Sequence, residues 1–264
     1  MKRDSGAARR RLGLRFGVLI TAAVAVLSVG CKRDSAQRSD DDDDEAAPAA
    51  AAAAPVATQA RAAVAAGSGA VWNFDSMAVG QPPTGFTFAR TGSGRPGRWV
   101  VRAVADAPSG ANVLAQEDSD RTDYRFPVAV ADAPTFGDVS VSVRCKAVSG
   151  RVDQACGIVW RYQDENNYYL ARANALEANV CWYYVQNGRR IEVKRVRVPV
   201  ASGVWHLLRA DMRGDHVEIY FNGQKLIDVH DSRFTTPGKV GVWTKADSYT
   251  LFDDLTAQPL GGGS

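Results

Sequence analysis

Side chains of the types that bind sugars gather between residues 152 and 247. Aromatic rings stack on the apolar CH faces of a sugar, while planar amides, carboxylates and guanidinium groups bind its hydroxyls. The residues that meet this description are Trp160, Tyr162, Tyr169, Arg172, Asn174, Trp182, Tyr184, Trp243, Lys245 and Asp247. We expect about half of them to pack in a core, because large aromatic side chains are mostly buried. These residues predict a carbohydrate or glycan ligand.

Alternation along an extended strand decides which of these side chains can act together. Trp160 and Tyr162 lie two residues apart and are expected on one face of a strand. Arg172 and Asn174 have the same spacing on the next strand, so they should point together. A buried charge without a partner is costly, which favours an accessible face or an acidic partner for the charged residues. The polar contacts to a ligand are expected from Arg172, Asn174, Lys245 and Asp247.

The acidic residues do not form a glycosidase motif. Retaining hydrolysis needs two carboxyl groups about 5–5.5 Å apart. Glycosidases of the laminarinase type place them on one strand, as Glu-x-Asp-x-x-Glu or Glu-x-Asp-x-Glu. No such run occurs, and the nearest acidic pair, Asp164 and Glu165, is expected in a turn. No catalytic residue is assigned, and the sequence favours binding over retaining hydrolysis.

The three histidines, His206, His216 and His230, are expected on neighbouring strands. A two-residue turn at Asn222-Gly223 would place His216 opposite Val229, so that His216 and His230 point to opposite faces. No metal-type spacing is present, and we predict no metal site and no other cofactor. The alternative is calcium at a loop rim, which would need hard oxygen ligands. Those oxygens would come from Asp75, Asp164, Asn166, Asp253 or Asp254.

Three of the four cysteines lie within the expected folded domain. Cys145 and Cys156 flank a turn near Gly150 almost symmetrically, so they could lie opposite each other and form a disulfide. Cys181 is then left over. A pairing that uses Cys181 stays open, because geometry rather than spacing decides which thiols can meet.

The N-terminus has the pattern of a bacterial export signal. A basic segment leads into the apolar stretch 12–30, which is too short to be a comfortable membrane span. Leu27-Ser28-Val29-Gly30-Cys31 resembles the lipobox of bacterial lipoproteins, which implies cleavage before Cys31 and lipidation of its thiol. Residues 1–30 are therefore expected to be a lipoprotein signal peptide. Under a sorting rule like that of enteric bacteria, Lys32 rather than Asp after the lipidated cysteine favours the outer membrane. We therefore predict an exported protein that is lipid-anchored in the cell envelope.

Residues 31–70 have the composition of a disordered tether. An acidic run at 40–45 is followed by an Ala/Pro-rich tract with almost no bulky apolar residue. Such a segment cannot bury enough apolar surface to offset the entropy of ordering it. We expect a flexible spacer between the lipid anchor and the folded domain. Residues 259–264 are glycine-rich and are expected to form a flexible tail.

The charge balance gives no indication of a nucleic-acid partner. The chain of 264 residues has a formal net charge of +3. The first fifteen residues alone contain six Lys and Arg residues and one Asp, so the positive excess of the whole chain is accounted for by the expected export signal. A basic binding face is therefore not expected.

Residues 71–258 have the residue pattern of an all-β domain. Short runs rich in Val, Tyr, Trp and Phe alternate with Gly, Pro, Asn and Asp, and no segment has a convincing helical period. The expected strands are 71–75, 99–104, 112–116, 139–143, 157–162, 168–174, 179–186, 191–198, 205–212, 216–221, 239–244 and 250–257. Asn187-Gly188 and Asn222-Gly223 are two-residue hairpin turns, and the second should place Phe221 opposite Gln224 and Ile219 opposite Leu226. About ten to twelve strands predict a two-sheet antiparallel jelly-roll sandwich.

Several of these strand and turn residues resemble a known group of proteins. Trp205-His206-Leu207-Leu208-Arg209, Gly214 and Tyr220-Phe221-Asn222-Gly223 resemble the pattern of concanavalin A-like and laminin G-like jelly rolls. With Trp160-Arg161-Tyr162, Asn167-Tyr168-Tyr169 and the segment 238–248, the chain is similar to bacterial proteins of the 3-keto-disaccharide hydrolase family. The resemblance covers residues 71–257 and implies a concanavalin A-like fold and a carbohydrate ligand. It does not imply turnover, because the shared residues are mostly those that the fold itself requires.

Three functions remain open from the sequence. The first is an envelope-anchored lipoprotein whose jelly roll binds carbohydrate or glycan. The second, which the family resemblance implies, is a hydrolase or lyase acting on 3-keto-glycosides, with Lys245, Asp247 or Glu165 as acid or base. The third is a laminin G-like module that binds another protein.

Overall fold

The computed structural model describes residues 69–261, and every structural statement below concerns this range. It contains fifteen β-strands and no helix, and hence no helix long and apolar enough to cross a membrane. The expected signal peptide, its lipobox with Cys31 and nearly all of the expected tether lie outside the described residues, as do the last three residues of the tail.

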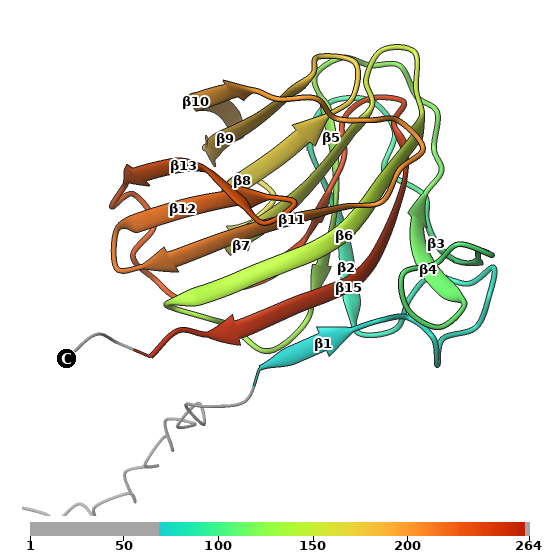
Figure 1. Ribbon diagram of the computed structural model, residues 1–264, viewed down its shortest axis with the longest axis horizontal. Helices are drawn as coiled ribbons and strands as arrows, with labels where there is room; N and C mark the ends of the chain where they lie inside the picture. The colour runs from blue at the N-terminus through green and yellow to red at the C-terminus, as the bar shows by residue number, and fades with distance from the viewer. Residues whose placement is uncertain (1–68, 262–264) are drawn as a thin grey trace, which may run out of the picture. The chain divides into compact units, whose positions relative to one another are not determined.

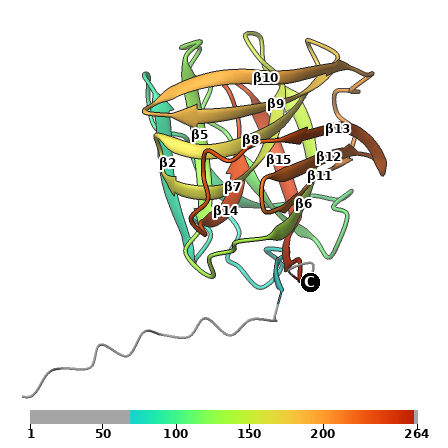
Figure 2. The same ribbon diagram turned by 90° about the vertical axis from the view of Figure 1, so that its left-hand side faces the viewer.

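The strands form two antiparallel sheets that pack face to face (Figures 1 and 2). One sheet has the order β13 (Gln224–His230), β12 (His216–Phe221), β11 (His206–Arg213), β6 (Val139–Ser149), β15 (Tyr249–Pro259), β4 (Asn112–Gln116) and β3 (Trp99–Ala103), with β1 (Ala70–Trp72) paired to β15. The other has the order β10 (Arg189–Arg197), β9 (Asn179–Gln186), β8 (Asn167–Asn174), β7 (Ala155–Asp164), β14 (Lys239–Trp243), β5 (Arg125–Ala131) and β2 (Phe86–Gly92). The predicted two-sheet jelly-roll sandwich is confirmed.

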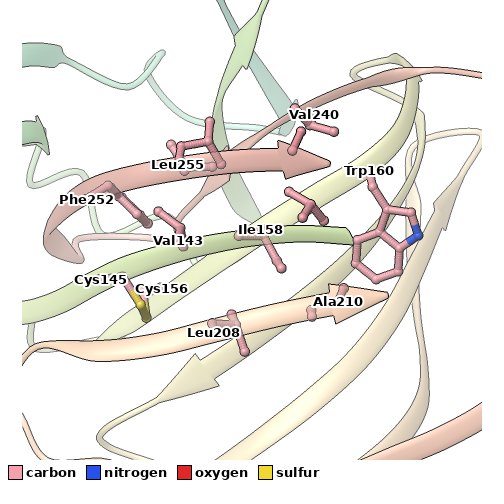
Figure 3. Packing of buried hydrophobic residues seen from close by; sticks show 14 of the residues in the cluster. Val143, Cys145, Cys156, Ile158, Trp160, Leu208, Ala210, Val240, Phe252 and Leu255 are labelled. Atoms are coloured by element: carbon pink, nitrogen blue, oxygen red, sulfur yellow. A yellow bond between two sulfur atoms is a disulfide. The ribbon is translucent and has the colours of Figure 1, made fainter. Parts of the chain in front are cut away.

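Strand β6 shows how sequence alternation builds the core between the sheets. Val139, Val141 and Val143 are fully buried, while the intervening serines are only half-buried on the other face of the strand. The valines pack in one large cluster with side chains from the facing sheet such as Ile158 and Val240 (Figure 3). Burial of this apolar face is the main contribution to the stability of the sandwich, at about 25 cal/mol for each Å² removed from water.

A disulfide between Cys145 and Cys156 links the two sheets, with the Cα atoms 6.2 Å apart (Figure 3). This is the pair that the sequence predicted, but its setting differs from the expectation. The chain does not fold back as a hairpin at Gly150, because β6 and β7 belong to different sheets. The disulfide therefore crosses the core. Cys181 is buried and has a free thiol.

Three of the fifteen strands are absent from the expected list. One is β13, which the predicted Asn222-Gly223 turn implied as the partner of β12, and the others are β2 and β5, which pair with each other along their whole lengths. All seven residues of β5 are buried, so the strand shows no alternation of apolar and polar residues. Pro127 within β5 also argues against a strand, because proline cannot donate a backbone hydrogen bond. In the structure Pro127 pairs with Arg90. A strand that is covered on both faces has no alternation of apolar and polar residues, so a search for a two-residue period does not find it.

The hairpin turn at Asn222-Gly223 forms as predicted, and both residues have positive φ. Phe221 pairs with Gln224, also as predicted. A register shift between Ile219 and Tyr220 then places Ile219 opposite Ile227 instead of Leu226. The predicted separation of the two histidines is consequently wrong. His216 pairs directly with His230, and their rings stack with centroids 4.8 Å apart.

Candidate ligand-binding site

Three aromatic residues that were candidates for ligand contact lie in the core between the sheets. Trp160, Tyr169 and Trp182 are 0% exposed and pack in a row, with ring centroids 5.7 Å and 5.9 Å apart. Tyr184 packs against the same core and is covered by the guanidinium group of Arg233, 4.0 Å from its ring centroid. A ligand at the surface cannot stack on the three buried rings, so their expected role is corrected to core packing.

The prediction that Trp160 and Tyr162 share a face is wrong. Arg161 lies between them with a φ of 48°, and the pairing of β7 with β8 shifts register beyond Trp160. This local change turns Tyr162 to the outer face of the seven-stranded sheet, while Trp160 points inward. Arg161 is held in place by hydrogen bonds that it donates to the carbonyl oxygens of Gly137 and Thr235. A positive φ at Arg161 could not be predicted from the sequence, because residues other than glycine rarely adopt it.

The outer face of the seven-stranded sheet has a buried apolar cluster of its own, which we call the outer-face cluster. It includes two of the candidate residues, Tyr162 and Trp243. The guanidinium group of Arg190 lies over the rings of Phe126, Tyr183 and Trp243, at 4.4, 4.6 and 5.6 Å from their centroids. The indole nitrogen of Trp243 and one guanidinium nitrogen of Arg190 have no hydrogen-bond partner within the described residues. Trp243 is 0% exposed, so its expected role in ligand contact is also corrected to packing, in this cluster, which leaves two buried donors without a partner in the described part of the chain.

Beside this cluster runs a chain of charged and amide groups, which we call the Asp153 network. Arg172 and Asn174 share the outer face, as alternation predicted. Tyr168 and Leu170 precede them at every second position along β8, on that same face, and both belong to the outer-face cluster. Asn174 donates a hydrogen bond of 2.7 Å to Asp153. Lys245 lies 3.1 Å from the other carboxylate oxygen of Asp153. Two of the four nominated polar residues, Asn174 and Lys245, are thus joined through one carboxylate.

The two charged ends of the Asp153 network differ in exposure. Arg172 is buried and makes two hydrogen bonds to Glu177, at 3.2 and 2.9 Å. The hydrogen bond from Arg172 lowers the pKa of Glu177 to about 2. Lys245 reaches toward the surface and contacts the exposed carboxylate of Asp123 at 2.7 Å. Burial raises the pKa of Asp153 between these two ends, and the charges of Arg172 and Lys245 partly offset that rise.

Asp247 holds the loop that carries Asp153. Its carboxylate accepts backbone hydrogen bonds from Arg151, Val152 and Asp153, at 2.9, 2.9 and 3.1 Å. Burial alone would raise the pKa of Asp247, but these donors outweigh burial and lower it. The side chain of Arg121 lies 3.6 Å away on the solvent side. Asp247 therefore remains ionised and positions the loop rather than exchanging protons.

A cleft with a volume of about 340 Å³ opens next to Asp247. It is lined by Glu117, Ser119, Ser149, Asp247 and Tyr249. These groups offer carboxylates, hydroxyls and one aromatic ring, the side-chain types that contact sugars. We call the cleft and the adjoining Lys245 and Asp153 the Asp247 site. Its polar groups come from the end of β6, the start of β15 and the loops after β4, β6 and β14.

Sequence reasoning missed Asp153, Glu177 and Tyr249. Asp153 reads as an ordinary turn acid, because the groups that pair with it are more than twenty residues away and belong to other strands. Glu177 could have been found, since it lies five residues beyond Arg172 and the chain turns back between them. A buried arginine requires an acidic partner, and Glu177 is the acid nearest to Arg172 in the sequence.

The residues considered for calcium do not form one site. Asp75 accepts hydrogen bonds from the backbone of Ala111 and Asn112, and Asp253 accepts one from Ser109. Burial raises the pKa of Asp253 to about 6. Asp164 caps the turn that contains Asn166. Within residues 69–261 these carboxylates are already used to fix loops, and the structure gives no reason to assign calcium to them.

No protein-family model matches the chain. Over 98 residues it is 29% identical to the levanase of Bacillus subtilis (strain 168), an alignment that covers 36% of this chain and 14% of that enzyme. The chain therefore spans only a small part of this curated relative.

Two solved structures are similar in fold. The carbohydrate binding module CBM66 from Bacillus subtilis matches with a TM-score of 0.52 and 22% identity, over 66% of this chain and 96% of the module. A structure described as a native glycosidic hydrolase matches with a TM-score of 0.50 and 16% identity, over 75% of this chain and 98% of that one. At these identities the likeness shows a shared jelly-roll fold.

Proposed function

We propose that the sandwich binds a carbohydrate at the Asp247 site. The observation that carries the proposal is a cleft lined by carboxylates, hydroxyls and a tyrosine, with Lys245 close by and held in place by the buried Asp153. Charged groups held in place by neighbours can donate to and accept from sugar hydroxyls without being reordered, which lowers the entropic cost of binding.

The two Bacillus subtilis relatives support a carbohydrate ligand. One is a carbohydrate binding module, and nearly its whole length aligns with this sandwich. The other is a levanase, of which a short segment is similar in sequence to this chain. Levan is therefore a reasonable first probe, beside a broad glycan array. The fold also serves unrelated functions, so the site residues must carry the argument.

Binding fits the site better than the alternative, hydrolysis or elimination of 3-keto-glycosides. Asp247 is ionised and committed to three backbone donors, and Lys245 is committed to two carboxylates. A general acid or base needs a free position facing the substrate and a pKa near the working pH. Asp153, with its raised pKa, is the one member of the Asp153 network with a property that an enzyme would use. A 3-keto-disaccharide turnover assay on the purified chain decides between the two functions.

Replacing Lys245 by methionine is expected to weaken glycan affinity at least about tenfold, since a hydrogen bond from a charged donor contributes about 1.5–3 kcal/mol. Isothermal titration calorimetry with levan oligosaccharides, or with the best ligand from the array, measures the change. Lys245→Arg should retain part of the affinity because it keeps the charge.

The matched control is Lys194→Met, the same change at an exposed position of β10 whose strand partner is the inward-facing Trp182. It should leave affinity unchanged. Equal affinity of wild type and Lys245→Met, with both variants folded, would exclude the Asp247 site. Binding of no glycan, with no turnover, would instead favour the laminin G-like protein-interaction module.

We also propose that the chain is an exported lipoprotein anchored through Cys31, with the tether holding the sandwich away from the membrane. The support is the lipobox pattern at 27–31 and the composition of 31–70. Cys31→Ala, or globomycin treatment, is expected to leave the unprocessed precursor on an immunoblot of the producing bacterium. Normal processing and membrane fractionation of the alanine variant would contradict the anchor. Cys181→Ala provides the control thiol change within the domain.

A further inference from the structure

The register of the β12–β13 hairpin gathers four potential metal ligands on the outer face of the eight-stranded sheet. His216 pairs with His230, and Glu218 pairs with Asp228, while Ile219 of the same hairpin packs in the core. Residues two apart on a strand share a face. Directly paired side chains have Cβ atoms about 4.5–5.5 Å apart. We call His216, Glu218, Asp228 and His230 the hairpin cluster. Strand β13 lies at the edge of the sheet and β12 lies beside it (Figure 1).

Three members of the hairpin cluster present their donor atoms to a common point. One ligating atom each of His216, Glu218 and Asp228 lies within 4.8 Å of the other two. The Nε2 atom of His216 is 2.7 Å from a carboxylate oxygen of Asp228. Ligands around a tetrahedral zinc ion, bonded at about 2.0–2.2 Å, stand about 3.4 Å from one another. Small rotations of exposed side chains would therefore suffice to bind an ion.

The fourth member, His230, fixes the direction of the first. Its ring stacks on that of His216 with an angle of 18° between the planes. Its Nδ1 atom lies 3.0 Å from a carboxylate oxygen of Asp215. Two stacked rings cannot both direct a nitrogen at the same ion in this arrangement, so His230 acts as a positioning residue. It keeps the Nε2 atom of His216 directed at Asp228.

A cation already lies between the two carboxylates. The Lys225 ammonium is 2.8 Å from a carboxylate oxygen of Glu218 and 2.7 Å from one of Asp228. Lys225 is nearly half exposed and has a flexible side chain, so it can move into solvent. A divalent ion that replaced it would compensate both carboxylates and gain the imidazole nitrogen as a third ligand.

We propose that His216, Glu218 and Asp228 bind a divalent transition-metal ion, with zinc as the reference ion, in exchange for the ammonium group of Lys225. One imidazole with two carboxylates suits zinc and its neighbours in the first transition series better than calcium or magnesium, which prefer oxygen alone. The site lies on the outer face of the eight-stranded sheet, whereas the Asp153 network lies on the seven-stranded sheet. The two sites are independent, and the metal proposal does not depend on carbohydrate binding.

The test is calorimetric titration of zinc chloride into the untagged, EDTA-treated full chain, with Cys31→Ser to remove a thiol that would bind zinc elsewhere. Saturable binding of one zinc ion is expected. His216→Ala should weaken it at least about tenfold, because even indirect changes to a metal site cost about 10–100-fold. Lys225→Met should strengthen it about fivefold by removing a competing charge close to the ion. The opposite signs of these two effects distinguish this site from unspecific surface binding.

Two further variants complete the experiment. Glu218→Gln should weaken zinc binding as His216→Ala does, and Lys194→Met, a lysine change outside the hairpin cluster, should have no effect. Cobalt(II) in place of zinc should give an absorption spectrum that changes in His216→Ala. Unchanged zinc affinity in both His216→Ala and Glu218→Gln would overturn the proposal. So would the absence of saturable binding by the wild-type cluster, or weaker binding in Lys225→Met.

Discussion

Replacing Trp160 by alanine is expected to lower the free energy of unfolding by about 3–5 kcal/mol, the usual cost of deleting a buried tryptophan. The indole lies between the sheets, fully buried, with the ring of Tyr169 on one side and the sulfur of Met212 3.2 Å from its nitrogen. Truncation leaves a cavity that the two covalently linked sheets can close only in part. Urea denaturation, followed by fluorescence of the other tryptophans or by circular dichroism, measures the loss.

The control for this change is Trp160→Phe, which keeps most of the apolar volume and should cost less than alanine. If Trp160 instead lined a ligand site, the alanine variant would lose affinity and keep its stability. A loss of stability below about 1 kcal/mol would contradict its assignment to the core, because that is the scale of an ordinary surface substitution. The experiment thus separates the sequence-based role of Trp160 from the structural one.

Replacing Arg172 by alanine is expected to destabilise the fold by about 3–5 kcal/mol, because breaking a buried ion pair leaves charges without compensation. Arg172 is 1% exposed, so its guanidinium depends on Glu177 and on the nearby charge of Asp153. Removing it leaves the buried Asp153 carboxylate with Lys245 as its one close cation. Chemical denaturation at neutral pH measures the difference. Arg195→Ala is the matched control, since Arg195 contacts the same Glu177 from an exposed position and should cost below about 1 kcal/mol.

The same variant should change the response to acid. The folded-state pKa of Glu177 is held at about 2, below its ordinary value of 4.5. A carboxyl whose pKa is lowered by folding contributes stability above its unfolded pKa, and this contribution is lost as the pH falls from about 4.5 to about 2. In Arg172→Ala the pKa of Glu177 should return toward its ordinary value, so this part of the acid loss should disappear. An unchanged acid profile would show that the pair does not control the ionisation of Glu177.

The sequence predicted the architecture because binary patterning directly reflects packing. Val139, Val141 and Val143 had to share a face, and Asn222-Gly223 had to turn the chain. Those local rules do not depend on distant partners. They hold in the structure and are sufficient to predict two antiparallel sheets.

The site was harder to predict because small backbone irregularities decide which way side chains point. A left-handed residue at Arg161 separates Tyr162 from Trp160, and a shift after Ile219 brings His216 and His230 together. Each irregularity reverses the outcome of strict alternation. Neither leaves a signature such as glycine at the position concerned.

The partners of the polar residues could not be predicted for a different reason. Asp247 holds the backbone of residues 151–153 across almost a hundred positions, and Lys245 meets Asp153 at a similar separation. Such contacts depend on the order of strands in the sheets. The strand order depends on contacts along the whole chain, so it cannot be predicted from a local pattern of residues.

Strand β1 is the element through which a force applied to the chain before residue 70 would reach the sandwich. It is attached to the sheet by three residue pairs, with Ala70, Val71 and Trp72 opposite Ala257, Thr256 and Leu255. Ala70 and Ala257 lie at the same end of the antiparallel pair, so a load that pulls these two positions apart would open the three pairs one after another rather than all at once. Detachment of β1 would free only these three residues from the sheet, while the disulfide between Cys145 and Cys156 keeps the two sheets joined.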